Sequence, residues 1–248
     1  MEPSLSRISS APWFNIVRKQ SVLMAGVGGI GSNAAYCLSR LGLKSMFLID
    51  DDIVETENIN GQFYSFDDLQ KPKVVALKDN IRKFSTQRSV GFKERLTSSR
   101  CIELMENREI NTLITGFDNM QSRKEAYNAF KSICETPANR GPFLYIDGRM
   151  NAEEFQIICL TSLPEDKYRF KLYEDDYLFS DEEAESTICS FKQTSFVAQI
   201  IGGMITNLFV NFWNNISLIE KNDDTVLQRS VPFVTEYSAD LMILHSKN

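Results

Sequence analysis

The chain has 248 residues, of which 43% are hydrophobic and 24% charged, and its formal net charge at pH 7 is −6. A chain of this kind can bury a full hydrophobic core, which excludes an intrinsically disordered protein. The acidic balance argues against nucleic acids and anionic membranes as partners, because both bind clusters of Lys and Arg.

We expect one domain over residues 1–248, because no internal repeat and no low-complexity linker divides the chain. Residues 1–20 are expected to form an N-terminal arm that packs its aromatic side chains on the domain. Residues 21–135 form a nucleotide-binding half, and residues 136–248 form a mixed-sheet half with a crossover loop at about 163–189.

The first regular elements flank a glycine-rich turn. Val22–Ala25 predicts a buried parallel strand, and Ser32–Leu41 has the periodicity of a helix. Between them lie the glycines Gly26, Gly28, Gly29 and Gly31. Glycine lets the backbone approach a phosphate closely, and the N–H groups and dipole of a helix N-terminus favour an anion there.

A second strand, Met46–Ile49, leads directly into Asp50. An acidic residue about twenty positions beyond such a turn binds a ribose hydroxyl, so the stretch predicts an adenine nucleotide. Asp51, Asp52 and Glu55 follow, and so many carboxylates repel one another unless they meet a ribose, a metal or backbone donors. A merely solvated acidic turn is the alternative.

Lys71-Pro72-Lys73 predicts the start of a helix that runs to about Phe84, since proline suits the first helical turn. A lysine at this end opposes the helix dipole. We therefore expect that Lys73 is placed there to bind phosphate.

Strands and helices alternate through the rest of the first half. The predicted strands are Ser89–Leu96 and Asn111–Thr115, and the predicted helices are Ser99–Asn107 and Ser122–Cys134. This alternation predicts an α/β fold with a Rossmann-like, doubly wound, mainly parallel sheet. Ligands of such sheets lie at the carboxyl ends of the strands, so the glycine turn, Asp50 and Asp118 should face one crevice.

The second half changes character. Phe143–Ile146 and Phe155–Leu160 predict strands joined by Asp147-Gly148-Arg149, with no helix between them. Part of the sheet in the C-terminal half is therefore expected to be antiparallel. The acidic and aromatic stretch from Leu163 to Ser186 has no clear periodicity.

A long apolar helix is predicted from Thr194 to Ile219. Polar residues such as Gln199 and Asn207 interrupt it, so we interpret it as a buried helix rather than a membrane span. The tail, Thr225–Leu244, predicts one or two late strands.

The five cysteines form no C-x-x-C pair and are odd in number. They predict neither a disulfide framework nor a structural zinc site. The N-terminus also lacks a signal-like apolar run, so a cytoplasmic location is expected.

Four motifs, in their order and spacing, resemble the ubiquitin-activating-enzyme-like adenylyltransferases that include ThiF and MoeB. They are GVGGIGS, DDDIVETENINGQ, KPKVVALKDNI and TGFDNMQSR, and they span about Val22 to Arg123. The resemblance implies an enzyme that uses ATP and Mg²⁺ to adenylate the C-terminal carboxylate of a ubiquitin-like protein or peptide, with release of pyrophosphate. It also implies a homodimer.

The same resemblance implies roles for individual residues. Asp50 would meet the ribose, and Asp118 would hold the Mg²⁺. Lys73, Gln62 and Asp118 would be catalytic. The implied nucleotide-binding set is Gly26, Gly28, Gly29, Gly31, Asp50, Asp52, Asn58, Gln62, Lys73 and Asp118.

One departure weakens the implied phosphate site. Gly61 stands where ThiF and MoeB have an arginine, so one positive charge is missing. Lys73, Arg123 or an arginine from a partner subunit could substitute, and Arg7 in the N-terminal arm is the candidate for a residue acting in trans. The alternative is a catalytically inactive subunit that binds a partner enzyme or a ubiquitin-like protein.

Cys189 follows the acidic segment and resembles the active cysteine of ThiF. A thiol near a helix N-terminus is a better nucleophile, because the dipole favours the thiolate. The acids from Glu174 to Glu185 act in the opposite direction, since they raise a thiol pKa. Two expectations therefore stay open for Cys189: a thioester nucleophile, or a small buried filler.

A third interpretation, from another class, is an NAD-dependent oxidoreductase, since the glycine turn and Asp50 permit it. The lone His245 is then the candidate proton donor. The Lys73 and Asp118 motifs would stay unexplained.

Overall fold

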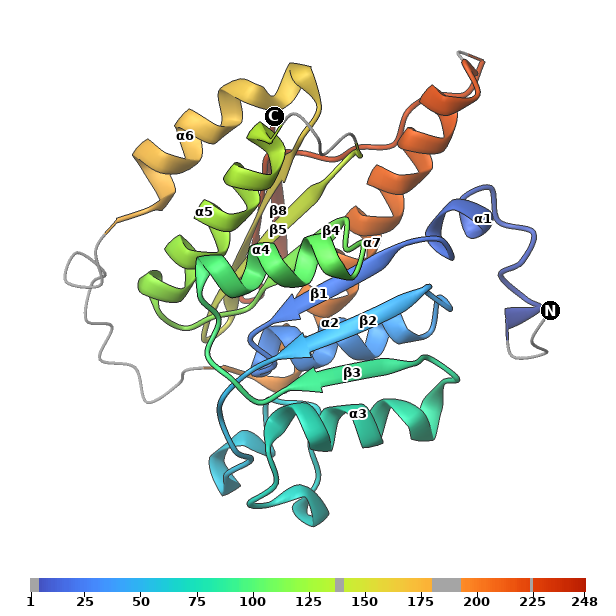
Figure 1. The fold of residues 1–248 in the computed structure, drawn as a ribbon. Coiled ribbons are helices and arrows are strands. Elements are labelled where there is room, and N and C mark those ends of the chain that lie inside the picture. Colours follow the sequence, from blue (N-terminus) through green and yellow to red (C-terminus); the bar gives the residue numbers. More distant parts are fainter. Residues whose placement is uncertain (1–4, 137–140, 180–192, 224) are drawn as a thin grey trace.

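A mixed eight-stranded sheet forms the centre of the protein, in the order β3-β2-β1-β4-β5-β6-β7-β8 (Figure 1). The computed structural model describes residues 5–136, 141–179, 193–223 and 225–248. Its strands are β1 Ser21–Ala25, β2 Ser45–Ile49, β3 Ser89–Phe92, β4 Thr112–Thr115, β5 Leu144–Asn151, β6 Glu154–Thr161, β7 Val234–Ser238 and β8 Ile243–Lys247.

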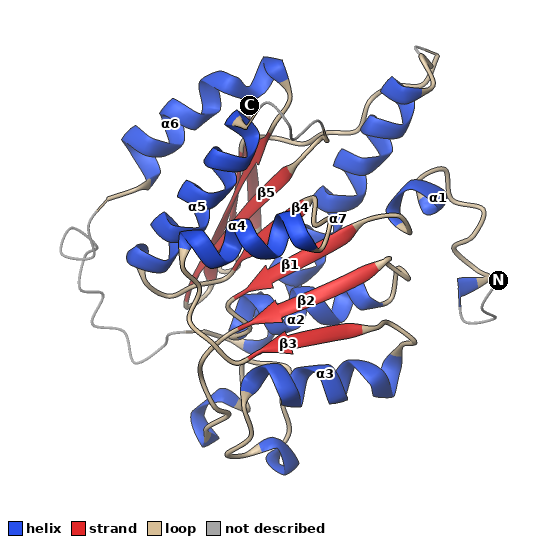
Figure 2. Ribbon diagram, viewed as in Figure 1, coloured by secondary structure: helices blue, strands red, loops and turns tan. Residues whose placement is uncertain are grey.

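Helices cover both faces of the sheet (Figure 2). The α-helices are α1 Phe14–Val17, α2 Gly29–Ser39, α3 Lys73–Phe84, α4 Ser98–Asn107, α5 Met120–Glu135, α6 Lys167–Tyr177 and α7 Ser195–Glu220. Short 3₁₀ helices are η2 Thr56–Asn58, η3 Phe66–Asp68 and η4 Pro164–Asp166.

The predicted sheet is confirmed in both of its parts. β1 to β5 pair in parallel, whereas β5, β6, β7 and β8 pair antiparallel. The right-handed crossovers of the parallel part place the carboxyl ends of β1, β2 and β4 on one edge. The turn that follows β1, the acidic residues that follow β2 and the loop that follows β4 therefore meet there.

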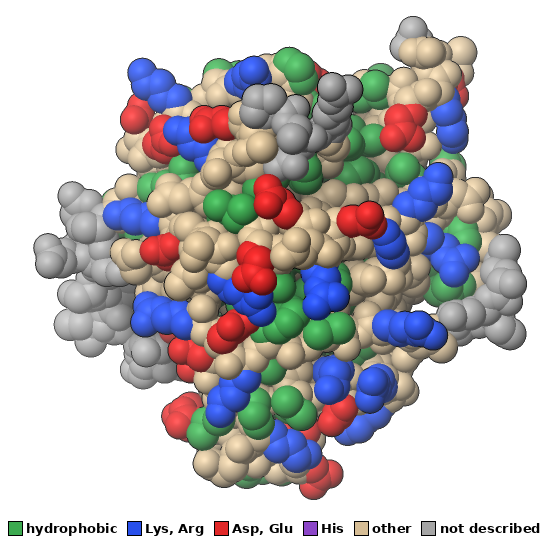
Figure 3. All heavy atoms as spheres, viewed as in Figure 1, with side chains coloured by type: hydrophobic (Ala, Val, Ile, Leu, Met, Phe, Trp, Pro, Cys, Tyr) green, Lys and Arg blue, Asp and Glu red, His purple; other side chains and the backbone are tan. Residues whose placement is uncertain are grey.

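The alternation of side chains along the central strands builds two hydrophobic cores. In β1, Val22 and Met24 pack with α2, α3 and α7 on one face, and Leu23 and Ala25 pack with α4 and α5 on the other. Every residue of β1 and β4 is buried, as expected for strands covered by helices on both faces. On the face that carries α4 and α5, acidic and basic side chains are interspersed over the described residues (Figure 3).

Three local predictions were wrong or incomplete. Asp147, Gly148 and Arg149 do not form a turn but lie inside β5, and the hairpin turns at Ala152, which has a φ of 48°. Residues 163–179 are not irregular, because they contain η4 and α6. β3 is also shorter than predicted, since it ends at Phe92.

The long helix α7 packs closely along α2. A Cβ atom on Gly202 would lie 2.9 Å from backbone atoms of Asn33 and Ala34, so only glycine permits this approach. By length and composition α7 is apolar enough to cross a membrane, but half of its most apolar 18-residue window is buried in the protein. Packing in the core therefore accounts for much of its apolar character.

Candidate nucleotide site

The turn after β1 has the geometry of a phosphate-binding loop. Gly26 has a φ of 79°, which favours glycine, and a Cβ atom on Gly31 would lie well under 3.0 Å from the carbonyl oxygen of Gly26. Gly28 is the N-cap of α2, and Ser32 N–H makes the first helical bond to the Gly28 carbonyl at 3.0 Å. The N–H groups before Ser32 have no partner within the helix, so the turn suits an anion.

Asp50 and Tyr64 hold this turn from two sides. The Asp50 carboxylate accepts hydrogen bonds from Val27 N–H at 2.8 Å and from Asp52 N–H at 2.9 Å. The Tyr64 hydroxyl donates to the Val27 carbonyl at 2.7 Å. Each Asp50 oxygen keeps a second lone pair, which can accept from a ribose hydroxyl.

The charge states of these two residues follow from their burial. Burial raises the pKa of Asp50, although the hydrogen bonds from Val27 and Asp52 and the charge of Lys73 act against it. Burial, together with the nearby charges of Asp50 and Asp68, also raises the pKa of Tyr64 well above its ordinary value. Tyr64 therefore stays a neutral hydrogen-bond donor at neutral pH.

Lys73 is brought to the same edge by a short bridge between Ile53 and Pro72. It is the first residue of α3, and its ammonium lies 2.8 Å from the Asp52 carboxylate. Only 6% of Lys73 is exposed. The opposition between a lysine and a helix N-terminus, noted from the sequence, is thus offset here by Asp52.

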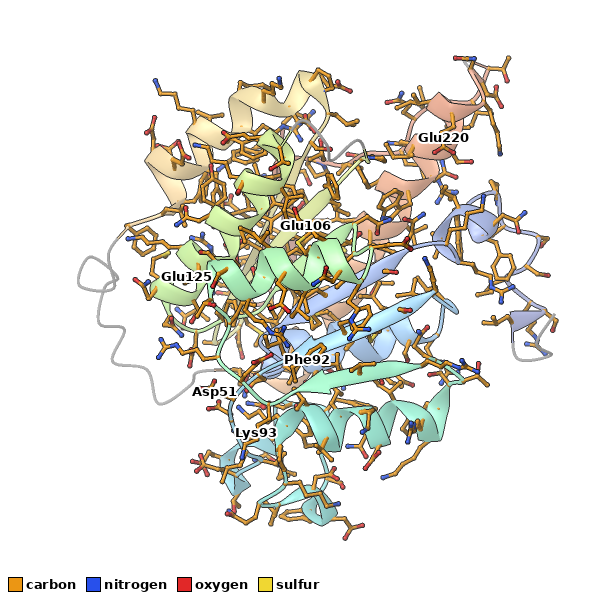
Figure 4. The ribbon with its side chains drawn as sticks, viewed as in Figure 1. Asp51, Phe92, Lys93, Glu106, Glu125 and Glu220 are labelled. Carbon is orange, nitrogen blue, oxygen red and sulfur yellow. The ribbon has the colours of Figure 1, made fainter. Side chains whose placement is uncertain are left out.

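Asp52, the partner of Lys73, belongs to a cluster of three successive acids. Asp50, Asp51 and Asp52 each place a carboxylate oxygen within 4.8 Å of the others. Asp51 lies where β2 ends, near Phe92 and Lys93 at the end of β3 (Figure 4). The repulsion expected between these acids is reduced by Lys73 and by the backbone donors of Val27 and Asp52.

Gln62 approaches the turn from the loop after β2. Its Nε2 lies 3.9 Å from the position that a Cβ atom on Gly28 would take, and its buried Oε1 accepts no hydrogen bond from any residue that the structure describes. Asn58 is used differently, because its Oδ1 accepts from the Glu55 N–H at 2.9 Å and caps η2. Only the side-chain N–H groups of Asn58 are therefore left to make the polyphosphate contact that the resemblance implies.

Asp118 lies next to the turn, at the end of β4. A Cβ atom on Gly26 would lie 3.0 to 3.1 Å from Phe117 and Gly116, and Gly116 N–H donates to the Ala25 carbonyl at 2.9 Å. The Asp118 side chain is exposed and accepts from Asn119 Nδ2 at 3.2 Å. The structure thus brings together the glycine turn, Asp50, Gln62, Lys73 and the loop that carries Asp118.

Arg123 is excluded as the replacement for the missing positive charge. It is buried, and its guanidinium pairs with Asp147 and donates to the carbonyl oxygens of Phe117 and Gly148. Asp147 also pairs with Arg149 at 2.8 Å. These residues form a buried network under the site rather than part of its surface.

The structure places Arg7 away from the site. Leu5 packs against Gly42, which follows the C-terminal end of α2, so the exposed Arg7 lies at the opposite end of that helix from the turn. The 11 residues of α2 correspond to roughly 16 Å. Cys189 lies outside the described residues.

His245 gives the oxidoreductase interpretation no support. It lies on β8, at the far edge of the sheet. Five strand-to-strand steps of about 4.8 Å separate β8 from β1, which amounts to roughly 24 Å. His245 therefore lies too far from the turn to donate a proton to a ligand bound there.

Sequence reasoning missed Tyr64, Asn33 and Gln193. Asn33 Nδ2 donates to the carbonyl oxygens of Gly29 at 2.8 Å and Gly61 at 3.3 Å, which ties the turn to the loop after β2. Its position on a largely apolar helix, directly after the glycines, was a usable signal. Nothing in the local sequence pointed to Gln193.

A family model described as the ThiF family matches residues 13–223 of the chain. A probable molybdopterin-synthase adenylyltransferase of Porphyra purpurea is 31% identical over 109 residues, which cover 43% of this chain and 28% of that protein. A ubiquitin-like modifier-activating enzyme 5 of Caenorhabditis elegans is 35% identical over 78 residues, which cover 32% of this chain and 19% of that protein. The matches therefore span less than a third of these relatives' own lengths.

Solved structures share the fold. Escherichia coli MccB with ATP has a TM-score of 0.67 at 16% identity and covers all of this chain and 72% of that one. PaaA has a TM-score of 0.68 at 18% identity and covers 96% of this chain and 66% of that one. At these identities the likeness supports the arrangement of strands and helices alone.

Proposed function

Because this chain belongs to the ThiF family, we propose that it adenylates the C-terminal carboxylate of a ubiquitin-like protein or peptide, using ATP and releasing pyrophosphate. The observation that carries the proposal is the meeting of the glycine turn, Asp50, Lys73 and the Asp118 loop at one edge of the sheet. The oxidoreductase interpretation leaves the motifs of Lys73 and Asp118 unexplained.

The residues fit a nucleoside triphosphate. Four of the six residues from Gly26 to Gly31 carry no side chain that could block a phosphate, and the buried amide oxygen of Gln62 has no hydrogen-bond partner among the described residues. Asp50 is placed for a ribose, and Lys73 is a cation whose present partner is an exposed carboxylate. Mg²⁺ bound with the triphosphate would supply further charge neutralisation, and Asp118 is the carboxylate that would hold it.

The adenylation reaction requires side chains that position the substrates and stabilise charge. A free carboxylate is a poor electrophile, whereas in an acyl-adenylate the leaving group is AMP. The protein therefore has to align the carboxylate with the α-phosphorus and to stabilise charge as it moves onto pyrophosphate. Lys73 and the turn N–H groups serve the second task, and no general base is needed, because the attacking carboxylate is already ionised.

Exchange of labelled pyrophosphate into ATP, measured with candidate ubiquitin-like proteins or peptides, tests the proposal. We expect exchange in the wild type and its loss in Lys73→Ala and in Asp118→Ala. Lys71→Ala, a change of an exposed lysine two residues away, is the matched control. Exchange that survives both site substitutions would refute the assignment.

A second candidate is an inactive subunit that binds a partner enzyme or a ubiquitin-like protein. Gly61 favours it, since the backbone there carries no side chain that could neutralise phosphate. Calorimetry with ATP and Mg²⁺ separates the two: no heat for the isolated chain, and heat regained with a partner, would support the inactive subunit.

Several finer points belong to the same proposal. We place the protein in the cytoplasm as a homodimer, in which Arg7 reaches the site of the second subunit. Transfer of the activated carboxylate to Cys189 would leave a thiol-labile adduct, which mass measurement of the protein detects. Cys189→Ser should abolish that adduct and leave pyrophosphate exchange unchanged.

A further inference from the structure

Gln193 fills the space between two glycines of the site. A Cβ atom on Gly29 would lie well under 3.0 Å from Gln193 Oε1, and a Cβ atom on Gly61 would lie 2.8 Å from its Cγ, Cδ and Nε2. Real Cβ atoms do not approach other atoms so closely, so the side chain rests directly against both backbones. The absence of a side chain at Gly61 is what makes room for it.

This placement is fixed from several sides. Asn33 holds Gly29 and Gly61 together through hydrogen bonds to both carbonyl oxygens. The methyl group of Met150 lies 3.1 Å from the same Cβ position of Gly29. Gln193 itself forms a bridge with Ala152 at the β5–β6 hairpin, so its backbone is anchored as well.

The chemistry of this position favours an amide that binds an oxyanion. Gly29 is the first residue of α2, where the helix dipole and free N–H groups attract negative charge. A carboxamide carries two N–H donors, whereas an apolar side chain of the same size would fill the space without offering any. Lys73, the nearby cation, is already paired with Asp52.

We propose that Gln193 is a nucleotide-binding residue: its Oε1 lies against Gly29 and its Nε2 against Gly61, and the N–H groups of Nε2 donate to a polyphosphate oxygen at the turn. This inference rests on the proposed function, because it assumes that ATP binds there. Gln193 precedes α7 and supplies an uncharged hydrogen-bond donor. Its side chain occupies the space that a side chain at position 61 would need.

Three substitutions test whether Gln193 donates hydrogen bonds to the nucleotide or only fills space. Gln193→Leu keeps the approximate volume but removes the donors, and we expect the dissociation constant for ATP with Mg²⁺ to rise about tenfold to a hundredfold, as for a lost hydrogen bond to a charged group. Gln193→Glu places a negative charge near phosphate, and the loss should be larger still. Gly61→Ala should push Gln193 away and give a loss similar to that of Gln193→Leu.

The double variant Gly61→Ala/Gln193→Leu completes the test. If Gly61→Ala acts by displacing Gln193, the two losses will not add. Gln156→Leu, the same replacement on β6, is the matched control and should bind ATP as the wild type does. Calorimetry gives the affinities, and the melting temperature without nucleotide shows that each variant is folded.

The outcomes distinguish a failure of this inference from a failure of the proposed function on which it rests. Wild-type binding that is lost in Lys73→Ala but unchanged in folded Gln193→Leu and Gln193→Glu would overturn the role of Gln193 alone. A wild type that binds no ATP, alone or with a partner, would overturn both.

Discussion

The ammonium of Lys73 lies 2.8 Å from the Asp52 carboxylate, and the backbone N–H of Lys73 donates to the Asp52 carbonyl at 3.0 Å. The two side chains differ greatly in exposure, at 8% for Lys73 and 65% for Asp52. A carboxylate in water thus holds a buried cation in place. It is also a partner that an incoming phosphate oxygen can replace.

Asp52→Asn is expected to destabilise the nucleotide-free protein by about 1 to 2 kcal/mol, because it leaves the buried Lys73 ammonium without a carboxylate. Phosphate would restore a partner, so ATP with Mg²⁺ should raise the melting temperature more in the variant than in the wild type. Thermal melts with and without nucleotide measure both effects. The exposed neighbour Asp51→Asn is the control, and a smaller rise than in the wild type would mean that Asp52 itself binds the nucleotide.

Tyr64→Phe removes one of the two groups that hold the Val27 peptide. We expect a loss of about 1 kcal/mol in the free energy of unfolding, as for a typical hydrogen bond, and a several-fold weaker affinity for ATP, because the backbone of Val27 then keeps only its hydrogen bond to Asp50. Urea denaturation and calorimetry report the two quantities. Tyr168→Phe, at a half-exposed tyrosine of α6, should change neither. Unaltered ATP binding in Tyr64→Phe would show that the hydroxyl does not orient the turn.

Asp147→Asn should be among the most destabilising changes, at about 3 to 5 kcal/mol near pH 7, because Arg123 and Arg149 would share a buried site without a carboxylate. Burial alone would raise the pKa of Asp147, but the two arginines and the hydrogen bonds from Arg149 and Tyr173 outweigh it and lower the pKa. A carboxyl group with a lowered folded-state pKa stabilises the protein above its unfolded value of about 3.9. That contribution is lost as the pH falls through the lowered pKa.

The difference in the free energy of unfolding between the wild type and Asp147→Asn is therefore expected to shrink below about pH 4. Urea denaturation at pH 7 and at successively lower pH values follows it. Asp175→Asn, on the exposed side of α6, should give no deficit at any of these values. A deficit of constant size from pH 7 to pH 3 would contradict the role given to the two arginines.

Two glycines of the turn should respond differently to alanine. Gly26→Ala combines a φ of 79° with clashes at 3.0 to 3.1 Å against Phe117 and Gly116, so a loss of at least about 1 kcal/mol in stability is expected. Gly28→Ala meets only Gln62 at 3.9 Å, an ordinary contact distance. It should lose nucleotide affinity with a smaller effect on stability, since its Cβ atom points to where phosphate approaches. Equal effects of both substitutions on melting temperature and affinity would be inconsistent with this view.

The parts of the site that were predictable from the sequence are those set by local pattern. Asp50 follows directly from the end of a strand, and Lys73 from a proline-marked helix start, so their positions are fixed by neighbours in the chain. Parallel pairing then brings these ends to one edge without further information. The fold of the first half was predictable for the same reason.

The parts that were missed depend on contacts between distant residues. Asp147 and Arg149 have the composition of a turn, but they lie in a strand because Arg123 and Tyr173, from two helices, satisfy them there. Gln193 reaches Gly61 only after the chain has passed through β1 to β6. α6 escaped notice because charged residues surround its one deeply buried aromatic side chain, Tyr173.

Three helices begin near the same edge of the sheet. α2 starts at the glycine turn, α5 starts just after Asp118, and α7 starts two residues after Gln193. Each helix N-terminus is equivalent to roughly half an elementary positive charge. The three together therefore contribute roughly one and a half elementary positive charges at this edge. The backbone of an acidic protein thereby provides a positive potential at the edge that also carries Asp50, Asp51 and Asp52.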